Sequence, residues 1–262
     1  MSDYETLLWE QAGNVVTLSL NRPAKKNAIS KQMFDELRSA FDKVATDDEV
    51  RCVVVTGAGG AFCTGADLSD PGNMVSTSFE FSDRMRNMNE LVRAVIDCPK
   101  PTIAKVTGVA AGAGANLALG CDLIIASTEA RFIQIFVKRG LVVDFGGSWT
   151  LTRLLPLNKA KELALLGDEI SGEQADALGL LNRLCTPEEV DAVTKDLAHR
   201  IAALPPRTVQ AIKANLNAAA DQSLEETLAD EQNTQSLIFT SEDTREAVIA
   251  FLEKREPRFT GR

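Results

Sequence analysis

The chain has 262 residues, enough for one large domain or for one domain with a smaller appendage, and it can bury a substantial core without disulfides. Its composition, 45% apolar and 25% charged, is ordinary for a globular protein. The net charge of −9 argues against a general nucleic-acid binder, so an anionic ligand would have to be held by local lysine, arginine and N–H groups.

The five cysteines are odd in number, and none forms a C-x-x-C pair, which indicates reduced, buried thiols in a cytoplasmic protein. The opening MSDYETLLWEQ has neither the basic nor the apolar region of a signal peptide, so none is expected. Lys105 and Asp122 interrupt the most apolar stretch, which therefore does not read as a membrane span. The single histidine, His199, is interpreted as a surface helix residue, and no metal site is expected.

The first half of the chain alternates strand and helix patterns. Residues 7–20 predict a β-hairpin that turns at Ala12-Gly13-Asn14. Ser30 is a predicted N-cap for a helix over 31–45. The continuous apolar run over 52–56 is typical of a strand covered on both faces. Then follow a loop over 69–78, a helix over 79–96 and a strand over 102–106. The apolar face of the first helix should comprise Met33, Leu37, Ala40, Phe41 and Val44.

The second half predicts shorter elements, and Pro205-Pro206 is its clearest break. The patterns together favour an α/β core with largely parallel strands over residues 1–204 and a C-terminal helical subdomain over residues 205–262. The predicted strands cover 123–126, 130–136 and 179–185, a turn-rich segment covers 141–148, and the predicted helices cover 149–155, 158–166, 171–178, 187–204, 208–220, 224–238 and 241–252.

Two apolar strands each lead into a glycine-rich turn, one ending in Gly65-Ala66 and the other in the stretch TGVAAGAGANLALGCD over 107–122. If both turns meet over one pocket, each can offer a backbone N–H to the same oxygen, which makes an oxyanion hole. Ala66 and Ala113 would be small there because a bulky side chain would block the oxygen. The alternative is a pair of tightly packed turns with no ligand.

Asp144 lies in GLVVDFGGSW, where apolar neighbours should leave its carboxylate poorly solvated. Desolvation raises a carboxyl pKa from its reference near 3.9 and makes the group a better base. A plain turn or N-cap role before Gly146-Gly147 is the alternative. Asp67 and Asp122 are better explained by bonds to nearby backbone N–H groups. The basic loop around Lys25 and Lys26 suits phosphate, or is a solvated surface loop.

These residues together resemble the crotonase superfamily, that is, the enoyl-CoA hydratase/isomerase family. The resemblance covers essentially the whole chain. It is carried by NRPAKKNAIS (21–30), VVVTGAGGAFCTGADLSD (53–70), KPTIAKVTGVAAGAGANLALGCDLIIAS (100–127), GLVVDFGGSWTLTRLL (140–155) and FLEKREPRFTGR (251–262).

The resemblance implies a spiral core of ββα units with a C-terminal helical part, and assembly as a homotrimer or hexamer. It implies an acyl-CoA thioester as substrate and no further cofactor, since the substrate itself carries coenzyme A. The thioester oxygen would lie between the N–H groups of Ala66 and Ala113. The residues that would border coenzyme A are Lys25, Lys26, Ala28, Gly65, Ala66, Asp67, Leu68 and Phe259.

The chain departs from the hydratases of this family at two positions. Asn116 and Phe136 stand where hydratases carry the two glutamates that activate water, which puts ordinary hydration in doubt. Asp144 matches the aspartate of isomerase members, in particular the branch that isomerises ring epoxides in phenylacetate degradation. The resemblance thus implies an isomerase in which Asp144 shuttles a proton, Asn116 orients substrate or base, and Phe136 and Trp149 help to form an apolar pocket.

Four alternatives stay open from the sequence. A hydratase, a non-catalytic acyl-CoA-binding protein and an acyl-CoA dehalogenase would all use this fold. A dinucleotide-binding dehydrogenase is suggested by VVVTGAGG, but the G-x-G-x-x-G pattern fails at Phe62 and again at Leu117.

Overall fold

The computed structural model describes residues 4–74 and 76–262. Residues 1–3, on which the expected absence of a signal peptide partly rests, lie outside the described residues, as does Val75 in the predicted loop over 69–78.

A six-stranded sheet forms the centre of the molecule. Its first two strands pair antiparallel as the predicted hairpin, and every later pair is parallel, because a helix or a long connection returns the chain each time. The strands, in spatial order, are β1 (Leu7–Ala12), β2 (Val15–Leu20), β3 (Cys52–Gly57), β4 (Thr102–Val106), β6 (Leu123–Ser127) and β9 (Arg183–Cys185).

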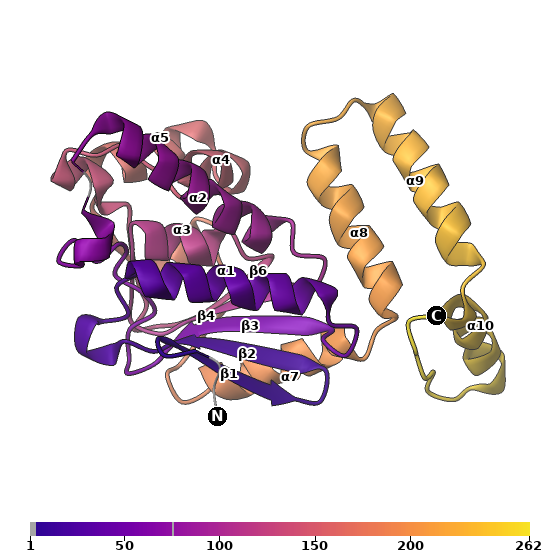
Figure 1. Cartoon of the computed structure of the whole chain (residues 1–262). Coiled ribbons are helices and arrows are strands. Elements are labelled where there is room, and N and C mark those ends of the chain that lie inside the picture. Colours follow the sequence, from indigo (N-terminus) through magenta and orange to yellow (C-terminus); the bar gives the residue numbers. More distant parts are fainter. Residues whose placement is uncertain (1–3, 75) are drawn as a thin grey trace.

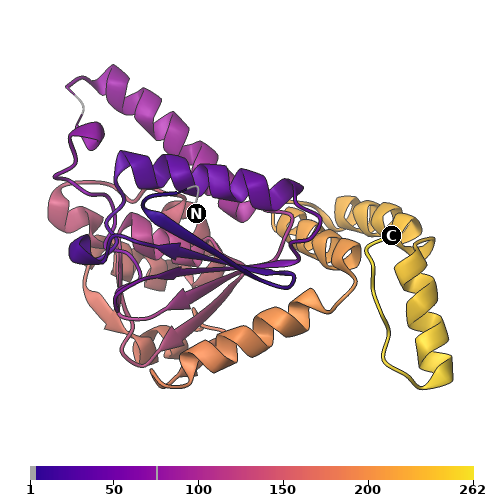
Figure 2. The ribbon, with the colours of Figure 1, turned by 60° about the horizontal axis from the view of Figure 1, so that its bottom comes forward.

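Both faces of this sheet are covered, as the apolar run over 52–56 predicts. Alternate residues of β3 point to opposite sides: Val53 and Val55 join one apolar cluster, and Cys52 and Val54 join the other. Figures 1 and 2 show α1, α2 and α3 on one face and α7 on the other. The carboxyl ends of the parallel strands are thereby left at one rim of the sheet, where the later loops gather.

A second, three-stranded sheet follows the ends of the central strands. β5 pairs parallel with β7, and β7 pairs antiparallel with β8. These strands are β5 (Val109–Ala111), β7 (Arg131–Ile133) and β8 (Glu169–Ser171). The repeated step from a main-sheet strand into a short second-sheet strand, and then into a helix, gives the spiral α/β core expected from the sequence.

Capping fixes the start of several helices where the sequence predicts it. The Ser30 hydroxyl accepts a hydrogen bond from Met33 N at 3.1 Å, and the predicted apolar face of this helix is buried. Ser171 forms a capping box with Gln174. The helices of the core are α1 (Lys31–Thr46), α2 (Ser78–Ile96), α3 (Ala113–Leu119), α4 (Gly147–Leu154), α5 (Leu157–Leu166), α6 (Gly172–Ala177) and α7 (Val190–Ala202), with short 3-10 turns η1 (Pro23–Lys25), η2 (Pro71–Asn73) and η3 (Ile135–Arg139).

The C-terminal helices extend away from the core as an arm, which Figures 1 and 2 both show. α8 (Pro206–Ala219) and α9 (Leu224–Phe239) contain no buried residue, and α10 (Glu242–Glu253) contains two. Several contacts join the arm to the core. Lys213 Nζ lies 2.7 Å from Asp122 Oδ2, Asn217 Nδ2 donates to Ile96 O at 3.4 Å, and Arg51 donates to Phe259 O at 3.0 Å. The division of the chain at residues 204 and 205 into two folding units stays a prediction. No helix within residues 4–74 and 76–262 is long and apolar enough to cross a membrane.

Two predicted elements were wrong in extent, and one strand was missed. The extended segment predicted over 130–136 is a three-residue strand followed by the 3-10 turn η3. The strand predicted over 179–185 covers only its last three residues, because Gly179 has a φ of +81° and its N–H closes the end of α6 on Asp176 O. Strand β8 was missed, since three residues are too few to show an alternation.

The two glycine-rich turns meet where the two sheets join. Ala111 N donates to Cys63 O at 2.8 Å, and Cys63 N donates to Val109 O at 3.0 Å, so the turns share a parallel bridge between Cys63 and Ala110. Gly114 packs on this bridge: a Cβ at position 114 would lie 2.7 Å from Cys63 Cβ and Sγ and even closer to its carbonyl oxygen.

We predict that Gly114→Ala destabilises the protein. A helical Gly→Ala change normally gains about 0.5–1 kcal/mol, but overpacking a tight contact costs about 1–3 kcal/mol, and here the obstacle is backbone that cannot rotate away. Thermal and urea denaturation should show a net loss. A melting temperature above that of the wild type would contradict the close contact of the two turns.

Candidate active site

The meeting of the two turns places two backbone segments side by side. Ile29 N donates to Gly65 O at 2.8 Å and Asp67 N donates to Ile29 O at 2.9 Å, which holds Ala66 in a bridge with Ile29. Gly65 has a φ of +90°, and a Cβ there would lie 2.9 Å from Ala111 O. Only glycine combines that backbone conformation with that approach.

The N–H groups of Ala66 and Ala113 have no hydrogen-bond acceptor among residues 4–74 and 76–262. The bridge with Ile29 uses the atoms on either side of Ala66, and Ala113 is the first residue of α3, where an N–H has no intrahelical partner. Both alanines line the same cavity of about 340 Å³. The condition set by the sequence, two turns over one pocket, is therefore met.

One face of α2 forms the opposite wall of this cavity. Its lining residues recur at helical spacing: Glu80, Asp83 and Arg84, then Asn87 and Met88. Three apolar side chains complete the walls near the alanines, namely Ile29, Phe34 and Phe145.

Asp144 lies on a constrained segment just before α4. The next residue, Phe145, is buried, lines the cavity and has a φ of +52°, a left-handed conformation that costs a bulky residue roughly 1–3 kcal/mol. Gly147 follows closely: a Cβ there would lie 2.6 Å from Asn116 Cγ. This packing holds the backbone of Asp144 in place. Its side chain is not itself among the lining residues, but the neighbouring Phe145 is.

Burial raises the pKa of Asp144 from its ordinary value of 3.8 to about 6, and the Arg84 guanidinium opposes part of this rise. Oδ1 of Asp144 is buried and accepts no hydrogen bond from the described part of the chain. A carboxylate without hydrogen bonds is poorly stabilised in its charged form, so its affinity for a proton is high. The sequence-based expectation of a desolvated aspartate is confirmed.

Asn116 is buried and connects Asp144 to the second sheet. Its Nδ2 donates to the Asp144 backbone carbonyl at 2.7 Å, and its Oδ1 accepts from Gln134 Nε2 at 2.8 Å. Both ends of the amide are thus used within the protein. Asn116 holds the segment that carries Asp144.

The loops expected to border coenzyme A lie together next to the cavity. Thr64 N donates to Lys26 O at 3.2 Å, and the Lys25 ammonium lies 3.3 Å from the Ser69 hydroxyl. Arg22 links the two loops, since it donates to Ala28 O at 2.6 Å and pairs with Asp67 at 2.9 Å.

Asp67 is buried, and its hydrogen bonds with Ser69 and the Arg22 guanidinium lower its pKa to about 2. Its carboxylate therefore joins the two loops, in agreement with the structural role that the sequence predicts for Asp67. The side chains of Lys25, Lys26 and Leu68 are exposed, with Leu68 at 72%.

Phe259 does not join this group in the single chain. Its carbonyl accepts from Arg51 at 3.0 Å, and Arg51 precedes β3, whereas Ala66 and Ala113 follow the far ends of β3 and β4. The length of the sheet therefore separates Phe259 from the loops that it was expected to meet.

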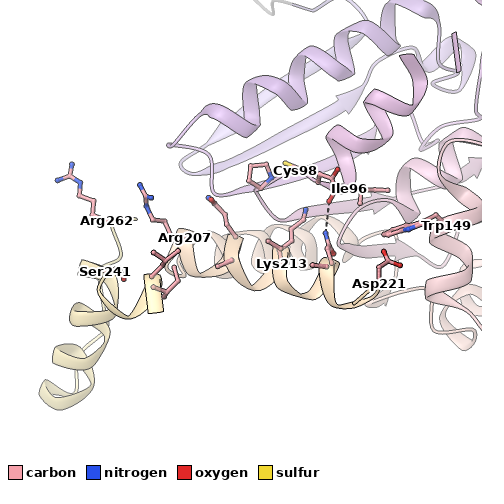
Figure 3. A pocket seen from close by; sticks show the side chains of 17 residues that line it. Ile96, Cys98, Trp149, Arg207, Lys213, Asp221, Ser241 and Arg262 are labelled. Atoms are coloured by element: carbon pink, nitrogen blue, oxygen red, sulfur yellow. Dashed lines mark hydrogen bonds between the residues drawn. The ribbon is translucent and has the colours of Figure 1, made fainter. Parts of the chain in front are cut away.

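Trp149 also lies outside the cavity, contrary to the expectation of an apolar pocket shared with Phe136. It stacks on Arg153, 3.8 Å from the ring centre, and lines a separate groove of about 1100 Å³ between the core and α8. Figure 3 shows Trp149 at one end of this groove and Arg262 at the other. Phe136 is buried behind Gly112.

Arg84 and Gln134 were missed by the sequence reasoning. Residue 84 sits in an ordinary amphipathic pattern, and only the packing of α2 over the cavity gives its charge a role. Among the described residues, no cluster of histidine, cysteine or acidic side chains could hold a metal ion. His199 is an exposed residue of α7, on the other face of the sheet from α2, as predicted.

Comparison with known proteins gives one consistent result. The enoyl-CoA hydratase/isomerase family profile matches residues 10–262. The chain is 40% identical to the 1,2-epoxyphenylacetyl-CoA isomerase of Escherichia coli K12 over 98% of this chain and 99% of that protein. It is 32% identical to the short-chain-enoyl-CoA hydratase of Clostridium acetobutylicum over 97% of each.

The solved structure of an enoyl-CoA hydratase from Mycobacterium smegmatis superposes with a TM-score of 0.92 at 33% identity, over 97% of this chain and 99% of that one. These similarities span the core, the two turns and the C-terminal helices alike. They favour acyl-CoA chemistry over the dinucleotide-binding alternative.

We predict that Asp144→Asn stabilises the protein above pH 6. Because the pKa is raised on folding, the charged form is penalised in the folded state at high pH, and this penalty disappears as the pH falls through about 6 towards 4. After allowance for partial exposure, the gain should be about 1–2 kcal/mol at pH 8 and near zero below about pH 4. Urea denaturation at several pH values measures it.

The control is Asp176→Asn, which changes an exposed carboxylate on α6. It should alter the free energy of unfolding by less than about 0.5 kcal/mol at every pH. An equal response of the two variants would show that Asp144 is solvated.

Proposed function

Since the chain belongs to the enoyl-CoA hydratase/isomerase family of acyl-CoA enzymes, we propose that it is an acyl-CoA isomerase. It would move a double bond from position 3 to position 2 of the acyl group, or carry out a related isomerisation of a ring epoxide. Two observations carry this proposal together. Two backbone N–H groups without a partner in the described chain line one cavity, and the half-buried carboxylate of Asp144, whose pKa is about 6, precedes Phe145, which lines the same cavity.

The proposed reaction begins with the thioester oxygen between the N–H groups of Ala66 and Ala113. Asp144, in its charged form, removes a proton from the carbon next to the carbonyl, and negative charge moves onto the oxygen. Two fixed N–H donors stabilise that charge, each by roughly 2.7–4 kcal/mol. Asp144 then returns the proton two carbons farther along, so one group acts first as base and then as acid.

Asn116 would serve this reaction as a positioning residue. Its amide holds the backbone carbonyl of Asp144 through a 2.7 Å hydrogen bond, and Gln134 fixes the orientation of the amide. No metal or redox group takes part in the proposed steps, and coenzyme A arrives as part of the substrate.

Hydration is the second candidate, because relatives such as the Clostridium acetobutylicum protein are named as hydratases. Adding water in a defined orientation needs a further base. The other carboxylates at the cavity have partners already: Glu80 caps α2, Asp83 lies 3.1 Å from Arg86, and Asp35 lies 2.6 Å from Lys31. This arrangement supports isomerisation over hydration.

We further propose that the two joined loops bind coenzyme A, with the Lys25 and Lys26 ammonium groups next to its phosphates. In this arrangement a contact between Phe259 and coenzyme A requires a second copy of the chain. The residues proposed for this site are Lys25, Lys26, Ala28, Gly65, Ala66, Asp67, Leu68 and, from a neighbouring copy, Phe259.

A homotrimer or a pair of trimers is proposed as the assembled form. The exposed apolar side chains of the arm, among them Leu216 at 69% and Leu237 at 76%, support it, because burying them would stabilise an assembly.

We predict that Asp144→Asn abolishes turnover but preserves binding. Loss of the proton-transferring group should lower kcat by about 100-fold to 10,000-fold, while the acyl-CoA dissociation constant changes by less than about threefold, because backbone N–H groups hold the carbonyl. Wild-type kcat/KM should rise with pH through about 6, as the carboxylate becomes charged. Asp176→Asn is again the control.

The substrates for this test are matched panels of 3-enoyl-CoA and 2-enoyl-CoA esters, followed by mass and absorbance. An isomerase shifts the absorbance with no change of mass. A gain of one water would instead establish hydration, and no turnover by the wild type on any ester would leave only acyl-CoA binding.

The oligomer proposal predicts a mass of three or six chains by light scattering. Leu237→Glu should shift the protein towards smaller species, because a charge in an apolar interface is costly to bury. Glu231→Gln on the same helix is the control. A wild-type protein that remains a single chain would contradict the proposal.

A further inference from the structure

Arg84 lines the cavity, and the proposed proton transfer gives it no contact with the substrate. It projects from α2 beside Asn87 and Met88, and it lies close enough to Asp144 to lower the pKa of that carboxyl group. Its Nη1 donates to Asn73 O, which anchors one edge of the guanidinium.

The guanidinium has five N–H donors, and most of them have no partner among residues 4–74 and 76–262. Within the described chain, Arg84 forms no direct ion pair and makes one hydrogen bond, although Glu80 and Asp83 are close in sequence. Those two carboxylates are held by the helix cap and by Arg86. A half-buried guanidinium on a ligand cavity can give these donors to water in the free protein and to an acceptor atom of a bound ligand in the complex.

We infer that Arg84 is a specificity-determining residue that donates hydrogen bonds to a neutral oxygen on the acyl group, so that the enzyme prefers acyl-CoA esters bearing an ether, epoxide, hydroxyl or ketone oxygen over plain hydrocarbon esters. This inference rests on the proposed function for the identity of the cavity as the acyl site. It adds which acyl groups the site selects.

A neutral oxygen fits the charges of the cavity better than a carboxylate does. Lys31 and Arg84 are the cations that line it, and Asp35, Glu80 and Asp83 are the anions. Asp144 is not a lining residue, but it lies close enough to Arg84 for the guanidinium to lower its pKa. An acyl carboxylate would gain from Arg84 but would be repelled by the anions, including the base itself. An ether or epoxide oxygen accepts from the guanidinium without that repulsion.

The free groups of Asp144 and Arg84 ask different things of the acyl group. Within residues 4–74 and 76–262, Asp144 Oδ1 accepts no hydrogen bond, and Arg84 has an acceptor only for Nη1. In the proposed reaction the first would face a C–H bond, and the remaining donors of the second would face an oxygen. A substrate that offers both would bind in one orientation only. A hydrocarbon ester displaces water from the free donors of the guanidinium without offering them an acceptor, and it should therefore be used less well.

The test uses 3-octenoyl-CoA and its two analogues in which an ether oxygen replaces the CH2 at position 6 or 7. Arg84→Met removes every donor and keeps similar bulk. For the analogue whose oxygen Arg84 reaches, kcat/KM should fall by about 10-fold to 100-fold, since a hydrogen bond to a charged donor is lost. For 3-octenoyl-CoA it should change by less than about threefold.

Arg84→Lys keeps the positive charge but loses the planar set of guanidinium donors. Its pH profile should therefore match that of the wild type, whereas its preference for the ether ester should be only partly retained. Arg93→Met, an exposed residue of the same helix, is the control and should change neither. The inference is overturned if Arg84→Met lowers kcat/KM equally for all three esters, or if it lowers none. An equal loss with a pH profile displaced above about 6 would assign Arg84 to Asp144 alone.

Measurements of ester affinity distinguish a failure of this inference from a failure of the proposed function. Calorimetry with Asp144→Asn, with and without Arg84→Met, measures the affinity of each ester without turnover. If the wild type isomerises none of the esters, the proposed function fails, yet a preference for an ether ester that disappears with Arg84→Met would still support the inference. Equal affinities for all esters in both proteins would refute it.

Discussion

The bridge between Cys63 and Ala110 is the contact on which the rest of the candidate active site depends. It ties a turn that follows β3 to a turn that follows β4, and so sets the distance between the N–H groups of Ala66 and Ala113. Backbone hydrogen bonds do this with little freedom, because neither donor nor acceptor can rotate independently of the chain. The small residues around the bridge follow from the same constraint, since Gly65 and Gly114 allow backbones to approach closer than any side chain permits.

The proposed base is tuned by two opposing effects. Burial without hydrogen bonds favours the neutral carboxyl group, and the charge of Arg84 favours the carboxylate. The effect of burial is larger than the effect of Arg84, so the pKa of Asp144 is raised to about 6. This value is near enough to neutral pH for one group both to accept and to release a proton. The strained Phe145 and the buried Asn116 contribute indirectly, as they fix the backbone from which this side chain projects.

Much of this arrangement was predictable from the sequence, because local rules govern it. The cap at Ser30, the covered strand over 52–56 and the desolvation of Asp144 all follow from a few neighbouring residues. The sequence could not predict that the two glycine-rich turns meet, because contact between distant segments depends on the order of the strands in the sheet. Arg84 was missed and Trp149 was misplaced for that reason, because their surroundings come from the packing of α2 and α8, which no local pattern records. The role of Phe259 stays a prediction, since the position of the tail in the single chain does not test it.

The C-terminal arm, formed by α8, α9 and α10, has too few contacts with its own core to explain its stability. Isolated helices of about 12–15 residues are marginal in water, so α8 and α9 need an apolar surface to pack against. The core supplies little of it: neither helix buries a residue, and the Lys213–Asp122 pair is their best-shielded link to the sheet. Leu216, Leu237 and Phe251 remain exposed along the arm. A neighbouring copy that covers them would stabilise the arm, and it could at the same time bring a tail aromatic towards loops that its own chain cannot reach.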